Sequence, residues 1–193
     1  FESSSFNGRS SLTLTFDDGL KGHLTLAAPL LEKYGFTGCF NIVTAEVGKP
    51  GHLTWDDIRE LKRRGHEIAS HTVTHPNLVT LLKEKGAAEV RAEIVRSRDA
   101  IAEALGEAPK FLCHPYMARS AAVDALVRDC GLEPFCGSRH NTGSDMTPAA
   151  FAARLDGWSE SRLRHTDILF HGVSAETGGY SPVATAADFE AMI

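Results

Sequence analysis

The feature of this chain that most constrains its fold is an alternation of short strand-like runs with longer helix-patterned segments. The strand-like runs lie near residues 11–16, 37–43, 66–70 and 134–138, and in the segments that lead into His114 and His171. Such an alternation is typical of a parallel sheet whose strands are joined by helices. We therefore predict an α/β fold with about six or seven βα units. Periodicity alone does not separate a barrel from an open sheet.

The helical segments carry their own start and packing signals. Thr54, followed by Asp57 three residues later, predicts a capped helix start, with Trp55, Ile58 and Leu61 on the inner face. Apolar residues at helical spacing predict the longest helix near residues 84–105. We expect further helical segments over residues 24–34, 123–127 and 148–163.

Four of the strand-like runs end in polar residues that can carry chemistry. Catalytic groups gather at the C-terminal ends of parallel strands in barrel-type enzymes, so we expect these ends to meet. They carry Asp17 and Asp18, His71 and His75, His114 and Tyr116, and His171.

The first strand end delivers two adjacent carboxylates, Asp17 and Asp18, and then Gly19. Successive side chains of a strand point to opposite faces, so the two carboxylates are suited to different tasks. One can hold a metal while the other faces a substrate. A strand that ends in Asp-Gly is also the ordinary pattern of a turn or a helix N-cap, so this pair alone does not define a site.

His71 and His75 add the second half of a metal-binding pattern. A separation of four residues places both imidazoles on one face of a helical turn, close enough to share one ion. With a carboxylate from another strand end they give two histidines and one carboxylate. Such a set leaves coordination positions open for water and substrate, as in a catalytic site of the zinc type.

Together these motifs resemble those of the polysaccharide deacetylase family, the metal-dependent carbohydrate esterases that share the NodB homology domain. The likeness runs in order from residue 12 to the last residue. Residues 15–19 are similar to the first motif, 71–75 to the second, 115–116 to the end of the third, 169–171 to the fifth, and 179–190 to the end of the domain. The resemblance implies a distorted (β/α) barrel of about seven parallel strands, with residues 1–193 as a single catalytic domain.

The resemblance also implies a role for each site residue. Deacetylation needs a metal that activates water, a base that accepts the proton of that water, N–H donors for an oxyanion, and an acid for the leaving amine. These roles would fall on Asp17 as general base, on Asp18, His71 and His75 as ligands of one divalent metal, on the Tyr116 main-chain N–H as oxyanion donor, and on His171 as general acid. The default metal for such ligands is Zn²⁺, with Co²⁺ or Ni²⁺ as alternatives.

The chain departs from the family pattern near the third motif. Cys113 stands where an arginine usually positions the catalytic base, and Met117 stands where a glycine commonly follows the tyrosine. The fourth motif, which supplies the carboxylate that tunes the acid histidine, has no clear match. The candidates for a replacement guanidinium are Arg119, Arg139 and Arg154, and those for the carboxylate are Asp145 and Asp156.

The expected substrate is an acetylated carbohydrate, most simply an N-acetylated amino-sugar polymer of the chitin, peptidoglycan or poly-N-acetylglucosamine type. O-deacetylation, as on acetylated xylan, stays open because an oxygen leaving group needs less acid catalysis than nitrogen. Cys113 also leaves open a carbohydrate-binding protein that keeps the metal site without turnover. A third alternative is a cyclic-amide hydrolase, although Asp18, His71 and His75 argue against its metal-free versions.

Charge and composition exclude some partners. The 25 acidic and 20 Lys and Arg residues are interspersed and give a net charge of −5, so we expect no nucleic-acid face. No apolar run is long enough to span a bilayer. The chain starts at Phe1 without an initiator Met, which indicates either a shortened chain or a processed secretory protein. We expect a secreted or cell-envelope protein whose signal peptide lies outside the chain shown. The oligomeric state stays open.

The remaining cysteines and histidines have simpler interpretations. We expect Cys39 and Cys113 to be small buried residues, whereas Cys130 and Cys136 flank a short turn and can pair in an oxidising compartment. We expect His66 to be structural and His114 to pack beside the site. The histidines expected to be solvent-exposed are His23, His52, His140 and His165.

Overall fold

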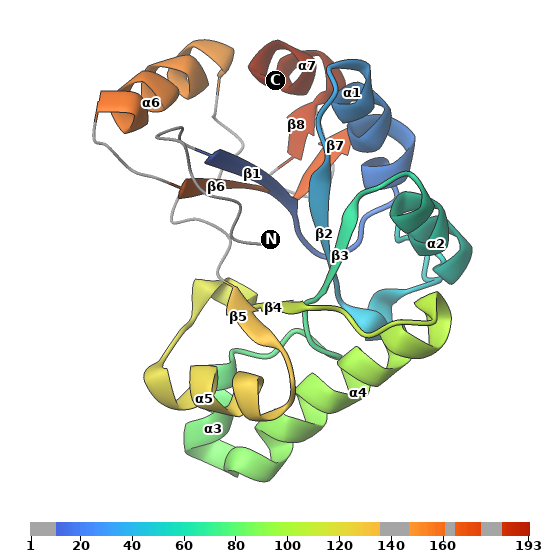
Figure 1. Cartoon of the computed structure of the whole chain (residues 1–193), viewed down its shortest axis with the longest axis vertical. Helices are drawn as coiled ribbons and strands as arrows, with labels where there is room; N and C mark the ends of the chain where they lie inside the picture. Colours follow the sequence, from blue (N-terminus) through green and yellow to red (C-terminus); the bar gives the residue numbers. More distant parts are fainter. Residues whose placement is uncertain (1–10, 136–146, 161–164, 175–182) are drawn as a thin grey trace.

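Six parallel strands form one curled sheet, a half-barrel, in the computed structural model (Figure 1). The structure describes residues 11–135, 147–160, 165–174 and 183–193. The strands are β1 (Ser11–Phe16), β2 (Gly38–Ile42), β3 (Glu67–Ser70), β4 (Phe111–Cys113), β5 (Glu133–Phe135) and β6 (His165–Phe170). They lie in the order β5-β4-β3-β2-β1-β6, and every neighbouring pair is parallel.

The helices follow the strands in the expected alternation. They are α1 (Ala28–Lys33), α2 (Trp55–Arg63), α3 (Leu78–Lys85), α4 (Ala87–Leu105), α5 (Ala121–Asp129), α6 (Pro148–Glu160) and α7 (Ala186–Met192). A π-helical turn over His23–Ala27 leads into α1. In Figure 1, α3, α4 and α5 gather beside β4 and β5, whereas α1 and α7 lie at the opposite end of the molecule.

A row of phenylalanines explains why the middle of the sheet is stable. Phe16 of β1 lies level with Phe40 of β2 and Phe170 of β6. Its ring stacks on theirs at centroid distances of 4.9 Å and 5.4 Å, and Phe189 of α7 meets Phe16 and Phe170 edge-on. All four rings are buried. Aromatic packing of this kind adds to the burial energy and fixes the strand ends that carry the next residues.

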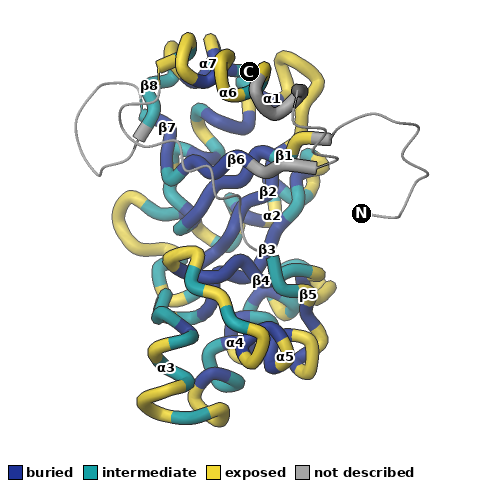
Figure 2. Tube along the Cα trace, turned by 90° about the vertical axis from the view of Figure 1, so that its left-hand side faces the viewer, coloured by how far each residue is buried: buried dark blue, intermediate teal, exposed yellow. Residues whose placement is uncertain are grey.

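A second apolar cluster lies under α3, α4 and α5. Its members come from those helices, from β4 and from the turn between α5 and β5. They include Leu78, Val90, Ile94, Leu112, Val123 and Val127. Figure 2 shows β2, β3 and β4 mostly buried in the middle of the molecule and exposed segments on the outer helices.

The expectations for the fold are confirmed, with two differences of detail. Thr54 caps α2 in a reciprocal capping box with Asp57, and Ile58 and Leu61 are buried. Gly86 divides the expected long helix, so that α3 precedes the 19-residue α4. Among the described residues the sheet has six strands rather than about seven. The next strand, β7 (Gly172–Ser174), pairs instead with β8 (Val183–Thr185).

In the ranges that the structure describes, no helix has both the length and the apolar character needed to cross a membrane.

Candidate active site

All six residues to which the sequence assigned site roles line one cleft of about 900 Å³. They follow β1, β3, β4 and β6 at the C-terminal edge of the sheet. Strand register explains this meeting, because Phe16 and Phe170 are paired and Asp17 N–H donates to the Phe170 carbonyl at 3.0 Å. The structure therefore brings these residues together. Their roles remain predictions.

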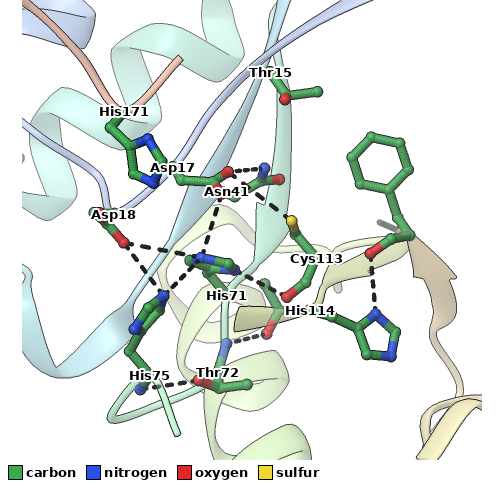
Figure 3. Close-up of polar contacts among 12 residues, drawn as sticks. Thr15, Asp17, Asp18, Asn41, His71, Thr72, His75, Cys113, His114 and His171 are labelled. Carbon is green, nitrogen blue, oxygen red and sulfur yellow. Dashed lines mark hydrogen bonds and ion pairs between the residues drawn. The ribbon is translucent and has the colours of Figure 1, made fainter. Parts of the chain in front are cut away.

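Three atoms that can act as metal ligands converge on one side of the cleft (Figure 3). His71 Nε2 and His75 Nε2 are 3.1 Å apart, and Asp18 Oδ1 lies 3.9 Å and 3.6 Å from them. Ligands about 2.0–2.2 Å from a tetrahedral zinc ion are themselves about 3.5 Å apart, so the set fits a divalent metal. Asp18, His71 and His75 form such a group among the described residues.

The hydrogen bonding of His71 prepares it as a ligand. Its Nδ1 donates to the Cys113 carbonyl at 2.9 Å, because a carbonyl can only accept. The Nε2 lone pair is therefore directed into the cleft. Burial lowers the pKa of both His71 and His75, and their mutual repulsion lowers the pKa of His75 further. Both imidazoles are thus held in the neutral form that binds metals.

The main chain at the cleft is strained. The five non-glycine residues with positive φ in the described ranges are Asp18 (74°), Thr72 (69°), His75 (60°), Tyr116 (59°) and Met117 (53°). Left-handed conformations are costly for such residues, and they cluster at sites where surrounding contacts hold them. Every one of them lines the cleft or lies between two residues that do.

The histidine pair does not lie on a helical turn, so that prediction was wrong. Left-handed Thr72 and His75 fold residues 71–75 into an irregular loop. Thr72 Oγ1 accepts the His75 N–H at 3.0 Å and closes the loop. The loop, rather than a helix, places the two Nε2 atoms 3.1 Å apart.

Glu93 of α4 holds the same loop from outside the cleft. Its Oε2 accepts the backbone N–H groups of Val73 and Thr74 at 3.0 Å and 2.9 Å, and its Oε1 accepts the Thr74 hydroxyl at 2.9 Å. The sequence did not reveal Glu93, because one more glutamate on a helix carries no signal of a contact 19 residues away.

Asp17 lies deeper than Asp18 and is buried. Its Oδ1 accepts a 2.6 Å hydrogen bond from Asn41 Nδ2, and Cys113 Sγ lies 3.9 Å from the same oxygen. Burial raises the pKa of Asp17 to about 6. The hydrogen bond from Asn41 opposes that rise and the charge of Asp18 adds to it. A carboxyl group with this pKa is mostly ionised at neutral pH and can still accept a proton.

No arginine replaces the missing guanidinium in the part of the chain that the structure describes. Arg119 forms an ion pair with Asp124 at 2.7 Å instead, and Arg154 is exposed on α6. Arg139 lies outside the described residues. Asn41, which the sequence analysis missed, is the nearest polar partner of Asp17. The available signal was an amide inside a wholly buried strand, where a polar side chain needs a partner.

His171 lines the cleft just after the end of β6, and a hydrogen bond from His23 fixes its main chain. His23 Nε2 donates to the His171 carbonyl at 2.8 Å. The main chains of Gly22 and Val173 also lie close together. Only glycine fits at position 22, because a Cβ atom there would lie 2.1 Å from the Val173 carbonyl oxygen. His171 Nδ1 is buried without a hydrogen-bond partner among the described residues. The tuning carboxylate stays unassigned, since Asp156 is exposed and Asp145 lies outside the described ranges.

His23 is fully buried, so the expectation that it is exposed was wrong. It packs against Phe16 and Phe40. Burial lowers the pKa of His23 to about 4, which the hydrogen bond to His171 only partly offsets. His52 is partly buried and lines the cleft. His140 and the side chain of His165 lie outside what the structure describes.

The other small predictions agree with the structure where it tests them. Buried His66 accepts the Gly38 N–H through Nδ1. Buried His114 donates to the Phe135 carbonyl and does not line the cleft. Cys39, Cys113 and Cys130 are buried. The proposed partner of Cys130, Cys136, lies outside the described residues.

The comparisons with known proteins agree with this geometry. Residues 6–135 match the sequence model of the family described as polysaccharide deacetylase. This chain belongs to the polysaccharide deacetylase family. It is 31% identical to a chitooligosaccharide deacetylase of Sinorhizobium fredii, over 84% of this chain and 80% of that protein. It is 28% identical to a chitin deacetylase of Pestalotiopsis, over 87% of this chain and 55% of that protein. The chain spans about half the length, or less, of most of the curated relatives it matches.

Solved structures show the same fold. A family 4 carbohydrate esterase from Streptomyces lividans, in complex with acetate, superposes with a TM-score of 0.66 at 26% identity. The match covers 86% of this chain and 79% of that one. A peptidoglycan N-acetylglucosamine deacetylase superposes with a TM-score of 0.69 over 86% of this chain and 73% of its own. Its sequence identity is 22%, which supports the fold alone.

Proposed function

We propose that this chain is a metal-dependent deacetylase that removes N-acetyl groups from an amino-sugar polymer, with residues 1–193 acting as one catalytic domain. The observation that carries the proposal is the convergence of Asp18, His71 and His75 beside the buried carboxylate of Asp17. This arrangement places a cation site next to a group that can accept a proton, which hydrolysis of an amide requires.

Asp18 and the two histidines would hold the metal, with Zn²⁺ as the default and Co²⁺ or Ni²⁺ as alternatives. When bound, the metal activates a water molecule and polarises the acetyl carbonyl. The protein residues do the rest. Asp17 accepts the proton of the attacking water, and the 2.6 Å contact with Asn41 orients its carboxylate.

Tyr116 and His171, which both line the cleft, complete the proposal. The Tyr116 main-chain N–H, in the left-handed turn after β4, donates to the oxyanion that forms on the acetyl oxygen. His171 protonates the leaving nitrogen as the C–N bond breaks. The hydrogen bond from His23 to the His171 carbonyl fixes the main chain from which this imidazole projects.

The substrate class rests on relatives named as acting on chitin, chitooligosaccharides and peptidoglycan N-acetylglucosamine. These names favour an N-acetylated glucosamine polymer over acetylated xylan. Peptidoglycan and chitin lie outside the cell membrane, so we also propose a secreted or cell-envelope location.

The direct test is acetate release from N-acetylglucosamine oligomers by the Zn²⁺-loaded protein. We expect release that a chelator abolishes and Zn²⁺ restores. Asp17→Asn should release no acetate while keeping its metal. Release from acetylated xylan alone would instead support an O-esterase. Oligomer binding without any release would support the carbohydrate-binding alternative, which gains weight because Asn41 and Cys113, and no described arginine, contact the Asp17 carboxylate at Oδ1.

A second arm of the test separates His171 from Asp17 by the proton that each handles. His171→Ala should slow an N-acetyl sugar by about 10²–10⁴-fold, the usual contribution of general acid–base catalysis. An aryl acetate should be slowed much less, because its leaving group needs little protonation. Asp17→Asn should stop both reactions. Equal losses for both substrates in His171→Ala would show that His171 is not the acid.

A further inference from the structure

A second set of possible metal ligands overlaps the first and shares one histidine with it. One possible ligand atom from each of Asp17, His71 and Cys113 lies within 4.8 Å of the other two, and all three side chains are buried. Cys113 Sγ is 3.9 Å from Asp17 Oδ1, and His71 Nε2 is 3.6 Å from Asp17 Oδ2. In Figure 3 the sulfur of Cys113 points toward Asp17, on the side away from Asp18.

These spacings match what a single ion needs. Ligands that bind tetrahedral zinc at about 2.0 Å through oxygen and 2.3 Å through sulfur lie about 3.5 Å apart. The two gaps to Asp17, 3.9 Å to Oδ1 and 3.6 Å to Oδ2, exceed that value only slightly, and the group as a whole lies within 4.8 Å, so binding one ion requires the side chains to rotate toward it. The set differs from Asp18, His71 and His75 in chemistry, because it includes sulfur, and sulfur ligands select soft cations.

The two sets cannot be filled at once. His71 Nδ1 is committed as a donor to the Cys113 carbonyl, so His71 has one free lone pair, on Nε2. That lone pair can bind one cation at a time. An ion held by Asp17, His71 and Cys113 would therefore take His71 from the other set and would occupy the carboxylate that we propose as the base.

We propose that Asp17, His71 and Cys113 form a second metal site that takes a thiophilic divalent cation such as Cd²⁺ and competes with the Asp18, His71 and His75 site. Binding forms a bond between the cation and Cys113 Sγ and releases the thiol proton to solvent. A cation bound there inhibits the protein, although neither its binding nor its detection depends on which reaction the protein catalyses.

The test titrates metal-free protein with CdCl₂ and follows the ultraviolet charge-transfer absorption of a cadmium–thiolate bond. Wild-type protein should develop this band with one equivalent of Cd²⁺. Cys113→Ser should lose the band and bind Cd²⁺ at least about 10- to 100-fold more weakly. Mutating a residue that only orients a metal ligand already costs this much affinity. Cys130→Ser, which removes a buried thiol in the second apolar cluster, is the matched control and should keep the band.

His75→Ala separates the two sets, because His75 belongs only to the first. This variant should lose Co²⁺ binding and keep the cadmium–thiolate band. A band that persists in both Cys113→Ser and Cys113→Ala would overturn the proposal, and so would its absence from wild-type protein. If both Cys113 variants fail to fold, His75→Ala decides alone. If this variant loses both the cadmium–thiolate band and Co²⁺ binding, only one site exists and the proposal is wrong.

Discussion

The shortest polar contact of the Asp17 carboxylate is with Asn41, whose Nδ2 lies 2.6 Å from Oδ1. A neutral amide thus stands where the family resemblance leads one to expect a guanidinium. It orients the carboxylate without adding a positive charge, so burial still raises the pKa of Asp17 to about 6. The amide itself is fixed, because Asn41 is fully buried in β2 and its Oδ1 accepts from Cys39 Sγ at 3.6 Å.

Asn41→Ala is expected to lower kcat by about 10- to 10²-fold, because a misplaced reacting group loses about this much. KM and metal content should change little, since Asn41 does not itself line the cleft and is not one of the proposed metal ligands. Steady-state kinetics on a chitin oligomer and metal analysis check this. Cys39→Ser, which keeps the amide in place, is the control. A variant with wild-type kcat would mean that Asn41 has no positioning role.

At the scale of elements, the loop over residues 71–75 depends on a neighbouring helix. Glu93 accepts three hydrogen bonds from Val73 and Thr74, between the two histidines. Charge-assisted bonds of this kind are stronger than neutral ones. They hold the left-handed turn that directs His75 toward Asp18.

Glu93→Gln should weaken Zn²⁺ binding by about 10- to 100-fold, the usual effect of removing a partner that orients a metal ligand. Competition with a chromophoric chelator measures this affinity without any substrate. Glu103→Gln, an exposed change on the same helix, is the matched control. Equal Zn²⁺ affinity in the two variants would show that Glu93 does not orient the metal ligands.

The same elements explain what sequence alone can predict. The strand ends carry Asp17, Asp18 and His171 within a few residues of clear apolar runs, so their meeting follows from parallel-strand topology. Asn41 and Glu93 act through contacts made only when β2 and α4 pack against other segments. Such tertiary contacts leave no periodic signal, and the left-handed residues of the histidine loop leave none either.

At the scale of the whole molecule, buried His23 makes folding sensitive to acid. Its pKa is about 4 in the folded protein and 6.5 in an ordinary environment. Above pH 6.5 the group is neutral in both states and contributes nothing to the pH dependence. Between pH 6.5 and 4 the unfolded chain takes up a proton that the folded protein does not. The free energy of unfolding should therefore fall by up to ~3 kcal/mol as pH drops through this window.

Denaturant unfolding of metal-free wild-type protein and His23→Gln at pH 7 and pH 4.5 checks this expectation. The variant should lose less stability between the two pH values than wild-type protein, whatever its stability at pH 7. Identical losses in the two proteins would show that His23 is not the group responsible.

In the proposed site, Asp18, His71 and His75 hold one divalent metal beside a base, Asp17, that is not itself a ligand. Metal content after Zn²⁺ loading and dialysis tests it most directly, with Asp17→Asn beside His71→Ala and His75→Ala. We predict one Zn²⁺ per chain in wild-type protein and in Asp17→Asn, and loss of stoichiometric Zn²⁺ from both histidine variants. Wild-type Zn²⁺ content in both histidine variants would contradict the account.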